Sequence, residues 1–203
     1  MLKLKRTRSL LETSLYSDMI NKLCRSQEMV KLDNSTNLRQ KIERNGVDSL
    51  TVNDLDFTDL DRISWSGGAA HIESVRKALE RTPEEVDYLA VRMPDGTPIA
   101  IGGVDYTSHT NTGTMWQLVT MESLRGLGIG TRLIKELEKK IAARGLHTAT
   151  IGVEEDNPGA RALYERLGYV HYGHEQSSWT QIDIQGERYT HHAEIDLLKK
   201  DLE

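Results

Sequence analysis

The glycine-rich segment at residues 123–130, SLRGLGIG, constrains the fold more than any other part of the sequence. It follows residues 112–121, which predict a β-strand, and leads into residues 128–145, which predict the strongest helix of the chain. That helix has one apolar stripe with a spacing of four residues, and a glycine stands where a left-handed terminator belongs. The stripe consists of Ile129, Leu133, Leu137 and Ile141. A strand, a glycine turn and a long helix in this order indicate an α/β fold.

Strand and helix patterns alternate along the rest of the chain. Strands are predicted at 47–55, 85–93, 98–109, 112–121 and 147–155, with two long strands over 169–198 around a turn at Gln185 and Gly186. Shorter helices are predicted at 57–65, 69–82 and 157–168. Gly102 and Gly103 lie inside a strand pattern and indicate a bulge or a close backbone approach. We therefore expect a central mixed, twisted β-sheet flanked by helices.

Residues 1–46 predict an N-terminal helical extension, and residues 47–203 predict the main domain. A turn signal, NSTN at 34–37, interrupts the helical pattern, and Gly46 marks the boundary. Residues 1–44 hold ten Lys or Arg against five Asp or Glu, whereas the remainder holds sixteen against twenty-six. The basic extension interleaves acidic residues, so we do not expect nucleic-acid binding. We expect the extension to pack either on the acidic domain of its own chain or on a second copy of the protein. A homodimer is therefore one alternative.

Composition excludes several classes of protein. A chain of 203 residues with 37% hydrophobic content suits one core. Its single cysteine, Cys24, cannot form an intrachain disulfide or a CxxC zinc site. No run approaches the eighteen or so apolar residues of a membrane span. We expect a soluble, cytoplasmic protein without a membrane partner.

The glycine segment is predicted to hold a phosphate group. The first N–H groups of a helix have no partner within the helix, and the helix dipole favours an anion there. A dinucleotide-binding fingerprint would need glycine at position 131, which is Thr131. A P-loop would need Lys after Gly130. Neither of these two phosphate loops fits the spacing.

Two motifs together resemble the GNAT superfamily of N-acetyltransferases. Arg125, Gly128 and Gly130 match its acyl-CoA pyrophosphate loop, Arg/Gln-x-x-Gly-x-Gly/Ala, between a strand and a long helix. The segment NPGARALYERLGY at 157–169 resembles the second motif of the family. The resemblance covers residues 50–198 and leaves out the extension. It implies a GNAT-type fold with splayed strands that hold acyl-CoA, and it implies acetyl-CoA as cosubstrate.

The resemblance also implies which residues hold the cosubstrate. Main-chain N–H groups from Arg125 to Thr131 would bind the pyrophosphate. Val119 and Met121 would pair with the pantetheine arm, and Asn157 would hold that arm from the other side. The complete expected set is Val119, Met121, Arg125, Gly126, Leu127, Gly128, Ile129, Gly130, Thr131 and Asn157.

Two catalytic roles follow from the same resemblance. Tyr164 lies where many relatives place a general acid, which would protonate the departing CoA thiolate. A general base is needed because an amine with a pKa near 10 is only about 0.1% neutral at pH 7. Many relatives place a glutamate on the strand before the glycine loop, where this chain has Trp116. We expect Glu154 to act instead, and the open alternatives are Glu155, Asp156, Asp105 and His109.

Three tryptophans, Trp65, Trp116 and Trp179, are the candidate substrate-binding residues, because an indole face attracts an ammonium group. Core packing is the alternative for each of them.

Four histidines lie close together in the sequence of the tail. His191 and His192 are adjacent on a predicted strand and so point to opposite faces, and we expect no metal site.

We expect an enzyme that moves an acetyl group to a primary amine of a small molecule or a peptide by direct attack. Another acyl-CoA donor or a hydroxyl acceptor stays open. The alternative from a different class is a non-catalytic acyl-CoA-binding sensor on the same fold. The replaced strand glutamate favours this sensor, and Tyr164 argues against it.

Overall fold

The computed structural model describes residues 36–182 and 187–202. The chain divides into two compact units, Met1–Arg44 and Asn45–Glu203. Residues 36–45 are helical, as expected. The turn predicted at 34–37 is wrong at positions 36 and 37, because Ser, Thr and Asn are favoured at helix starts as well as in turns. Residues 34 and 35, the Cys24 region and the turn at Gln185 and Gly186 lie outside the described residues.

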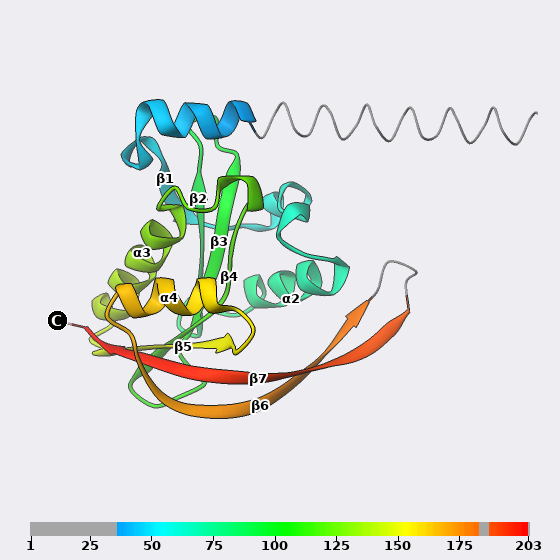
Figure 1. Ribbon diagram of the computed structural model, residues 1–203, viewed down its shortest axis with the longest axis vertical. Helices are drawn as coiled ribbons and strands as arrows, with labels where there is room; N and C mark the ends of the chain where they lie inside the picture. The colour runs from blue at the N-terminus through cyan, green and yellow to red at the C-terminus, as the bar shows by residue number, and fades with distance from the viewer. Residues whose placement is uncertain (1–35, 183–186, 203) are drawn as a thin grey trace, which may run out of the picture. The chain divides into compact units, whose positions relative to one another are not determined.

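Within the described part of the second unit, seven strands form one mixed sheet in the order β1-β2-β3-β4-β5-β7-β6 (Figure 1). β4 and β5 are parallel, and the other neighbouring pairs are antiparallel. This arrangement confirms the α/β class and the mixed sheet. The strands are β1 (Thr51–Asp54), β2 (Val86–Arg92), β3 (Pro98–Asp105), β4 (Thr112–Thr120), β5 (Thr148–Glu154), β6 (Val170–Ile182) and β7 (Arg188–Asp201).

The start of this unit differs from the sequence expectation. Part of the predicted first strand is a 3-10 turn, η1 (Val47–Ser49), and the predicted helix at 57–65 is two 3-10 segments, η2 (Phe57–Arg62) and η3 (Ser64–Ser66). A capping box starts η2. The Asp56 side chain accepts a hydrogen bond from the N–H of Thr58, and the Asp59 side chain accepts one from the N–H of Asp56.

The other helices follow their sequence patterns. They are α2 (Ala69–Leu79), α3 (Ile129–Ala143) and α4 (Pro158–Arg166), with a short 3-10 turn, η4 (Glu122–Leu124), before α3. All four residues of the predicted α3 stripe are buried, and Gly145 has the left-handed φ of +73°. Asn157 caps α4 by accepting the N–H of Ala160 at 3.1 Å. Among the described residues, no helix has the length and apolar content needed to cross a membrane.

The helices cover opposite faces of the sheet. On one face, Ile141 of α3 packs so closely on Gly113 that a Cβ there would lie 2.4 Å from it. Tyr169, just after α4, donates to Glu138 of α3 at 2.9 Å. On the other face, α2, η2 and η3 pack on β2 and β3 through a buried cluster that includes Ile63, Val75, Ala78, Tyr88 and Ile101. The sheet therefore separates an α3/α4 face from an α2 face.

A buried ion pair ties η2 to β2. The Arg92 guanidinium donates to both carboxylate oxygens of Asp59, at 2.7 and 2.6 Å, and to the carbonyl of Asp54 at 3.1 Å. Both side chains are less than 10% exposed. The hydrogen bond from Arg92 holds the pKa of Asp59 below its usual value.

We expect Asp59→Ala to lower the free energy of unfolding by about 3–5 kcal/mol, because it leaves Arg92 buried without its counter-charge. The matched control is Glu73→Ala, which removes an exposed carboxylate from Arg76 and should change stability little. Urea denaturation at pH 7 measures both variants.

At acid pH, the difference in the free energy of unfolding between the wild type and Asp59→Ala should become smaller. The folded pKa of Asp59 is lowered, so its contribution is complete above the unfolded value of about 3.9 and is lost as the pH falls through the folded pKa. Equal losses for Asp59→Ala and Glu73→Ala at pH 7 would contradict a stabilising role for the buried pair.

Candidate functional site

A cavity of about 640 Å³ opens on the α3/α4 face, beside the end of β4. It is lined by the end of β4, the glycine loop, α3 and α4. Its lining includes Leu118, Val119, Thr120, Arg125, Gly126, Gly128, Ile129, Gly130, Thr131, Asn157, Ala160, Leu163 and Tyr164. The sequence motifs that are far apart along the chain therefore meet at one cavity.

The cavity lies where two parallel strands separate. Pairing between β4 and β5 ends at Met115 and Ile151, although β4 continues to Thr120 and β5 to Glu154. Beyond Met115, the edge of β4 has no strand partner on the β5 side. This separation is the expected splay, and it leaves main-chain groups of β4 open to an extended ligand.

A β-bulge in β4 stands at the splay. The register between β3 and β4 shifts between Ile101 and Gly103, and Gln117 has a positive φ of 51°. A Cβ at Gly102 would lie 2.2 Å from the Leu118 side chain, so the predicted bulge and close approach at the glycine pair are confirmed.

Gln117 connects three elements of the α2 face. Its Nε2 donates to Ser74 Oγ of α2 at 3.0 Å, and its Oε1 accepts from the Tyr88 hydroxyl of β2 at 3.2 Å. The sequence analysis missed these three residues. The only signal for them was the glycine pair on the neighbouring strand.

The glycine loop presents unpaired main-chain donors. Gly126 and Gly128 have φ of +83° and +84°, a region that strongly favours glycine. The first hydrogen bond of α3 runs from the N–H of Arg132 to the carbonyl of Gly128, and no side chain caps the helix start. The N–H groups of Ile129, Gly130 and Thr131 thus have no acceptor within the helix. Such a helix start is suited to an anion.

The other expected cosubstrate residues lie around the loop. Val119 and Asn157 line the cavity, and Arg125 lines it with its Nε 3.4 Å from the carbonyl of Thr120. Met121 and Leu127 are not among its lining residues. The N–H of Met121 donates a hydrogen bond to the carbonyl of Ile99 in β3, so this N–H is not free to pair with the pantetheine arm.

Tyr164 is the buried titratable group of the cavity. Its side chain is 7% exposed, and its ring contacts the edge of Tyr169 at a centroid distance of 6.1 Å. Burial raises the pKa of Tyr164 to about 12, so the phenol stays protonated at neutral pH. Its hydroxyl has no hydrogen-bond partner among residues 36–182 and 187–202, which leaves the proton available to a ligand.

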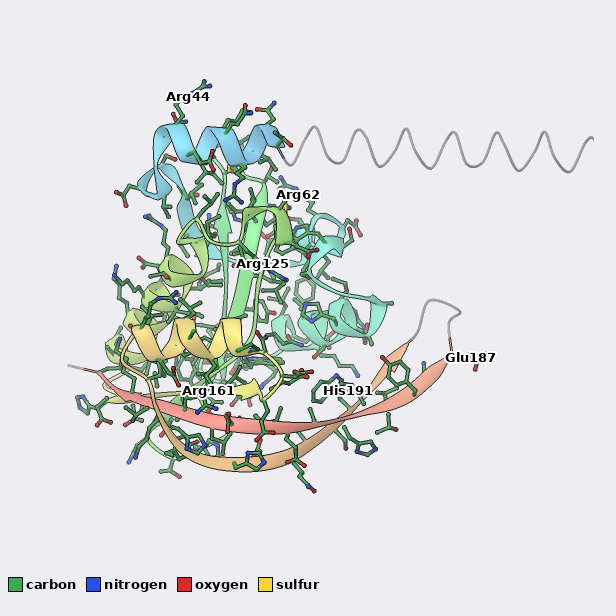
Figure 2. The ribbon with its side chains drawn as sticks, viewed as in Figure 1. Arg44, Arg62, Arg125, Arg161, Glu187 and His191 are labelled. Atoms are coloured by element: carbon green, nitrogen blue, oxygen red, sulfur yellow. The ribbon has the colours of Figure 1, made fainter. Side chains whose placement is uncertain are left out.

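The candidate bases lie on different faces. Glu154 ends β5 opposite Ile195, and its carboxylate is 3.4 Å from Nε2 of His191. Along β7, His191 and Ile195 share the face that Leu197 also uses, which is opposite to that of Asp196. Glu155 turns instead toward His174 at 3.7 Å. In Figure 2, His191 lies nearer α2, whereas Arg161 lies between α4 and β7.

Asp105 and His109 lie away from the cavity lining. Burial would raise the pKa of Asp105, but hydrogen bonds from Arg81 and Thr107 outweigh it and hold the pKa well below its usual range. This carboxylate is therefore a weak base that closes a turn. His109 and Asp156 are exposed.

The three tryptophans are all partly buried. Trp116 packs edge-on against Tyr88 at 6.0 Å, and Trp65 packs on the same core cluster of the α2 face. Trp179 lies 4.7 Å from the ring of His191. The ring nitrogens Nε1 of Trp65 and Trp116 and Nε2 of His71 are buried without a partner in the described part of the chain. Two of these three atoms belong to tryptophans that were predicted as substrate-binding residues, whereas His71 was not predicted from the sequence.

Comparison with known proteins agrees with this geometry. The model of the acetyltransferase (GNAT) family matches residues 55–169. The ribosomal-protein-S18-alanine N-acetyltransferase of Escherichia coli is similar in structure, with a TM-score of 0.59 at 16% identity over 75% of this chain and 94% of that one. Spermidine/spermine N-acetyltransferase SpeG from Vibrio cholerae has a TM-score of 0.56 at 19% identity, over 76% and 94%. PaiA N-acetyltransferase from Thermoplasma acidophilum, in complex with coenzyme A, has a TM-score of 0.54 at 15% identity, over 75% and 99%.

We expect Gly128→Ala to lower the free energy of unfolding by about 1–2 kcal/mol, because a Cβ is disfavoured at its left-handed φ. Gly159→Ala is the matched control in the first turn of α4, where a Cβ would come no closer than 3.9 Å to its neighbour. Alanine stabilises a helical position relative to glycine, so the control should be neutral or more stable. Thermal unfolding measures the stability of both variants. Equal changes in stability for Gly128→Ala and Gly159→Ala would contradict the loop geometry.

Proposed function

This chain belongs to the acetyltransferase (GNAT) family, and we propose that it transfers an acetyl group from acetyl-CoA to a primary amine. One observation carries the proposal. The unpaired N–H groups at the start of α3, the open edge of β4 and the buried phenol of Tyr164 all border one cavity. The donors suit a pyrophosphate, the edge suits an extended arm, and the phenol suits the reacting end.

The cavity supports acetyl-CoA as the donor. Main-chain N–H groups from Gly126 to Thr131 would bind the pyrophosphate, with glycines that let it approach the backbone. Val119 is in register with Ile101 of β3, and alternation with the Met121 bond turns its main chain toward β3. The main chain of the adjacent Thr120, whose carbonyl faces the unpaired edge, and the side chain of Asn157, across the cavity, would therefore hold the pantetheine arm. The side-chain oxygen of Asn157 already caps α4, so its NH₂ group is the part left to donate. Bound acetyl-CoA supplies a thioester that an amine can attack.

The two faces of the sheet carry different residues of the proposed site. Tyr164 lies on the α3/α4 face, whereas Trp65, Trp116, Trp179 and Glu154 belong to the α2 face. The strands β4 and β5 no longer pair beyond Met115, and we propose a gap there that connects the two faces. We infer that the amine binds on the α2 face, between indole rings, and reaches the thioester through this gap.

Glu154 is the proposed base, and Tyr164 the proposed acid. Glu154 is partly exposed and pairs with the His191 imidazole, so it can pass an amine proton on to water. Trp116 occupies the position of the usual family glutamate, which moves this task to the end of β5. Tyr164 donates its proton toward the sulfur as negative charge develops there.

Replacing the phenol should separate binding from chemistry. We expect Tyr164→Phe to lower kcat by roughly 10²–10⁴-fold with little change in acetyl-CoA affinity, since only the proton donor is lost. Tyr172→Phe, at an exposed tyrosine of β6, is the matched control and should keep full activity. CoA-thiol release with a panel of amines measures turnover, and calorimetry measures binding.

The panel also tests the alternative function. Acetyl-CoA binding without thiol release from any peptide or small-molecule amine would favour an acyl-CoA sensor over an enzyme. Unchanged turnover in Tyr164→Phe would remove Tyr164 from the mechanism.

We expect Glu154→Gln to lower kcat/KM at pH 7 by at least about tenfold and to lose less at higher pH, where more of the amine is neutral. Asp156→Asn, an exposed carboxylate two residues on, is the matched comparison. A larger effect of Asp156→Asn would assign the base to the loop after β5 instead.

A further inference from the structure

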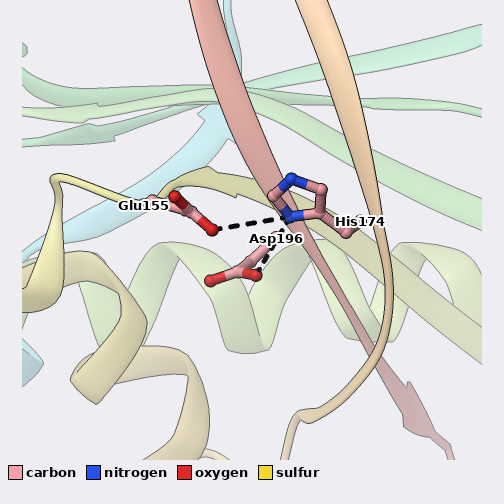
Figure 3. Close-up of side chains that lie close together, drawn as sticks. All are labelled: Glu155, His174 and Asp196. Atoms are coloured by element: carbon pink, nitrogen blue, oxygen red, sulfur yellow. Dashed lines mark ion pairs between the residues drawn. The ribbon is translucent and has the colours of Figure 1, made fainter.

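A histidine and carboxylate cluster lies on the α3/α4 face, outside the cavity lining. Its centre consists of Glu155 after β5, His174 of β6 and Asp196 of β7 (Figure 3). One ligand atom from each of these residues lies within 4.8 Å of the other two. Three separate elements thus bring one nitrogen and two carboxylate oxygens to one point.

We propose that Glu155, His174 and Asp196 form a binding site for a divalent transition-metal ion of the zinc class. Nδ1 of His174 is 3.7 Å from Glu155 Oε1 and 3.6 Å from Asp196 Oδ1. Zinc ligands at about 2.0–2.2 Å in tetrahedral geometry lie roughly 3.4 Å apart. Both distances from Nδ1 lie within a few tenths of an ångström of this separation, and water completes the coordination of the ion.

Neighbouring side chains already orient the histidine. Nε2 of His174, the nitrogen away from the cluster centre, lies 2.8 Å from Glu194, which Gln176 also holds at 2.8 Å. Metal-bound histidines typically donate their other ring N–H to a carboxylate in this way, which fixes the ring and its tautomer. Asp196 is held as well, by Arg161 at one oxygen and by His171 at 3.2 Å from the other.

A β-bulge builds this arrangement. The register of β6 against β7 shifts between His171 and Gly173, which pair with Leu198 and Leu197. His174 pairs with Asp196. Residues three apart on a regular strand face opposite ways, but the extra residue at Tyr172 turns His171 and His174 to the same face as Asp196.

Charge and access favour a cation. Glu155, Glu194 and Asp196 bring three negative charges, and Arg161 brings one positive charge, which it shares with Glu165 at 3.0 Å. Asp196 is 7% exposed at its side chain, whereas His174 and Glu155 are 42% and 57% exposed. The buried carboxylate anchors the site, and the two exposed ligands give an ion a route from solvent. Imidazole together with carboxylate suits zinc better than magnesium, which prefers an all-oxygen shell.

Zinc would link the β5–α4 connection to the long β6–β7 hairpin. Glu155 stands two residues before Asn157, which caps α4 and lines the cavity. The ion would therefore stabilise the folded domain and would not take part in acetyl transfer, so the proposal does not depend on the proposed function.

The test uses the untagged full chain, stripped with EDTA and titrated with Zn²⁺ against a chromophoric chelator. We expect one site in the micromolar range or tighter and a higher Tm with zinc, because the ion binds the folded state. His174→Ala and Glu155→Gln should each weaken this site by roughly 100-fold or more, since even an outer-shell change costs 10–100-fold. Both should abolish the zinc-dependent rise in Tm.

His192→Ala is the matched control. His192 is exposed and lies on the same strand and face as Asp196, opposite Ser178, four positions from the pairing of His174. It should bind zinc like the wild type, and Mg²⁺ should not compete. The proposal is overturned if the wild type takes up no zinc, or if His174→Ala and Glu155→Gln keep wild-type affinity. Folding is checked by circular dichroism of each stripped variant.

Discussion

Parallel pairing between β4 and β5 stops at Met115 and Ile151 while both strands continue, and the cavity depends on this early end. A fully paired sheet would leave no open edge on β4 for an extended ligand. The bulge at Gln117 holds the strands in this state. Gly102 leaves room for Leu118, and Gly103 leaves room for Trp116 and Tyr88. The bulge is fixed by two hydrogen bonds, one that Gln117 donates to Ser74 of α2 and one that it accepts from Tyr88 of β2. The site thus depends on an interruption in the hydrogen-bond ladder of the sheet.

Helix α4 connects the two polar sites of the α3/α4 face. Its first turn is capped by Asn157 at the cavity, and its buried Tyr164 closes the same cavity. Its outer Arg161 bonds Asp196 of β7, beside the His174 cluster. Of these contacts, the one from Arg161 fixes the position of α4 against a strand, β7. The position of this cavity wall therefore depends on an interaction at the end of the sheet as well as on contacts at the cavity.

Local patterns allowed much of the fold, and the elements that line the cavity, to be predicted from the sequence. The α3 stripe, the left-handed glycines and the Asn157 cap involve residues within a few positions of one another, so their spacing carries the information. The two 3-10 segments at 57–66 were missed because a capping box such as that of Asp56 and Asp59 also starts α-helices, so the sequence pattern does not separate the two kinds of helix. The His174 cluster was missed because it depends on the register of two long strands. Spacing alone puts His171 and His174 on opposite faces, and only the bulge at Tyr172 brings them together.

The proposed function depends most on the start of α3, which we propose binds the pyrophosphate of an acyl-CoA. Backbone amide chemical shifts of the ¹⁵N-labelled protein during titration with acetyl-CoA test it most directly, because they report each N–H group separately. We expect saturable 1:1 binding with the largest chemical-shift changes at Gly126, Gly128, Gly130 and Thr131. No binding, or large shifts only on the β6–β7 hairpin with the loop unchanged, would contradict it.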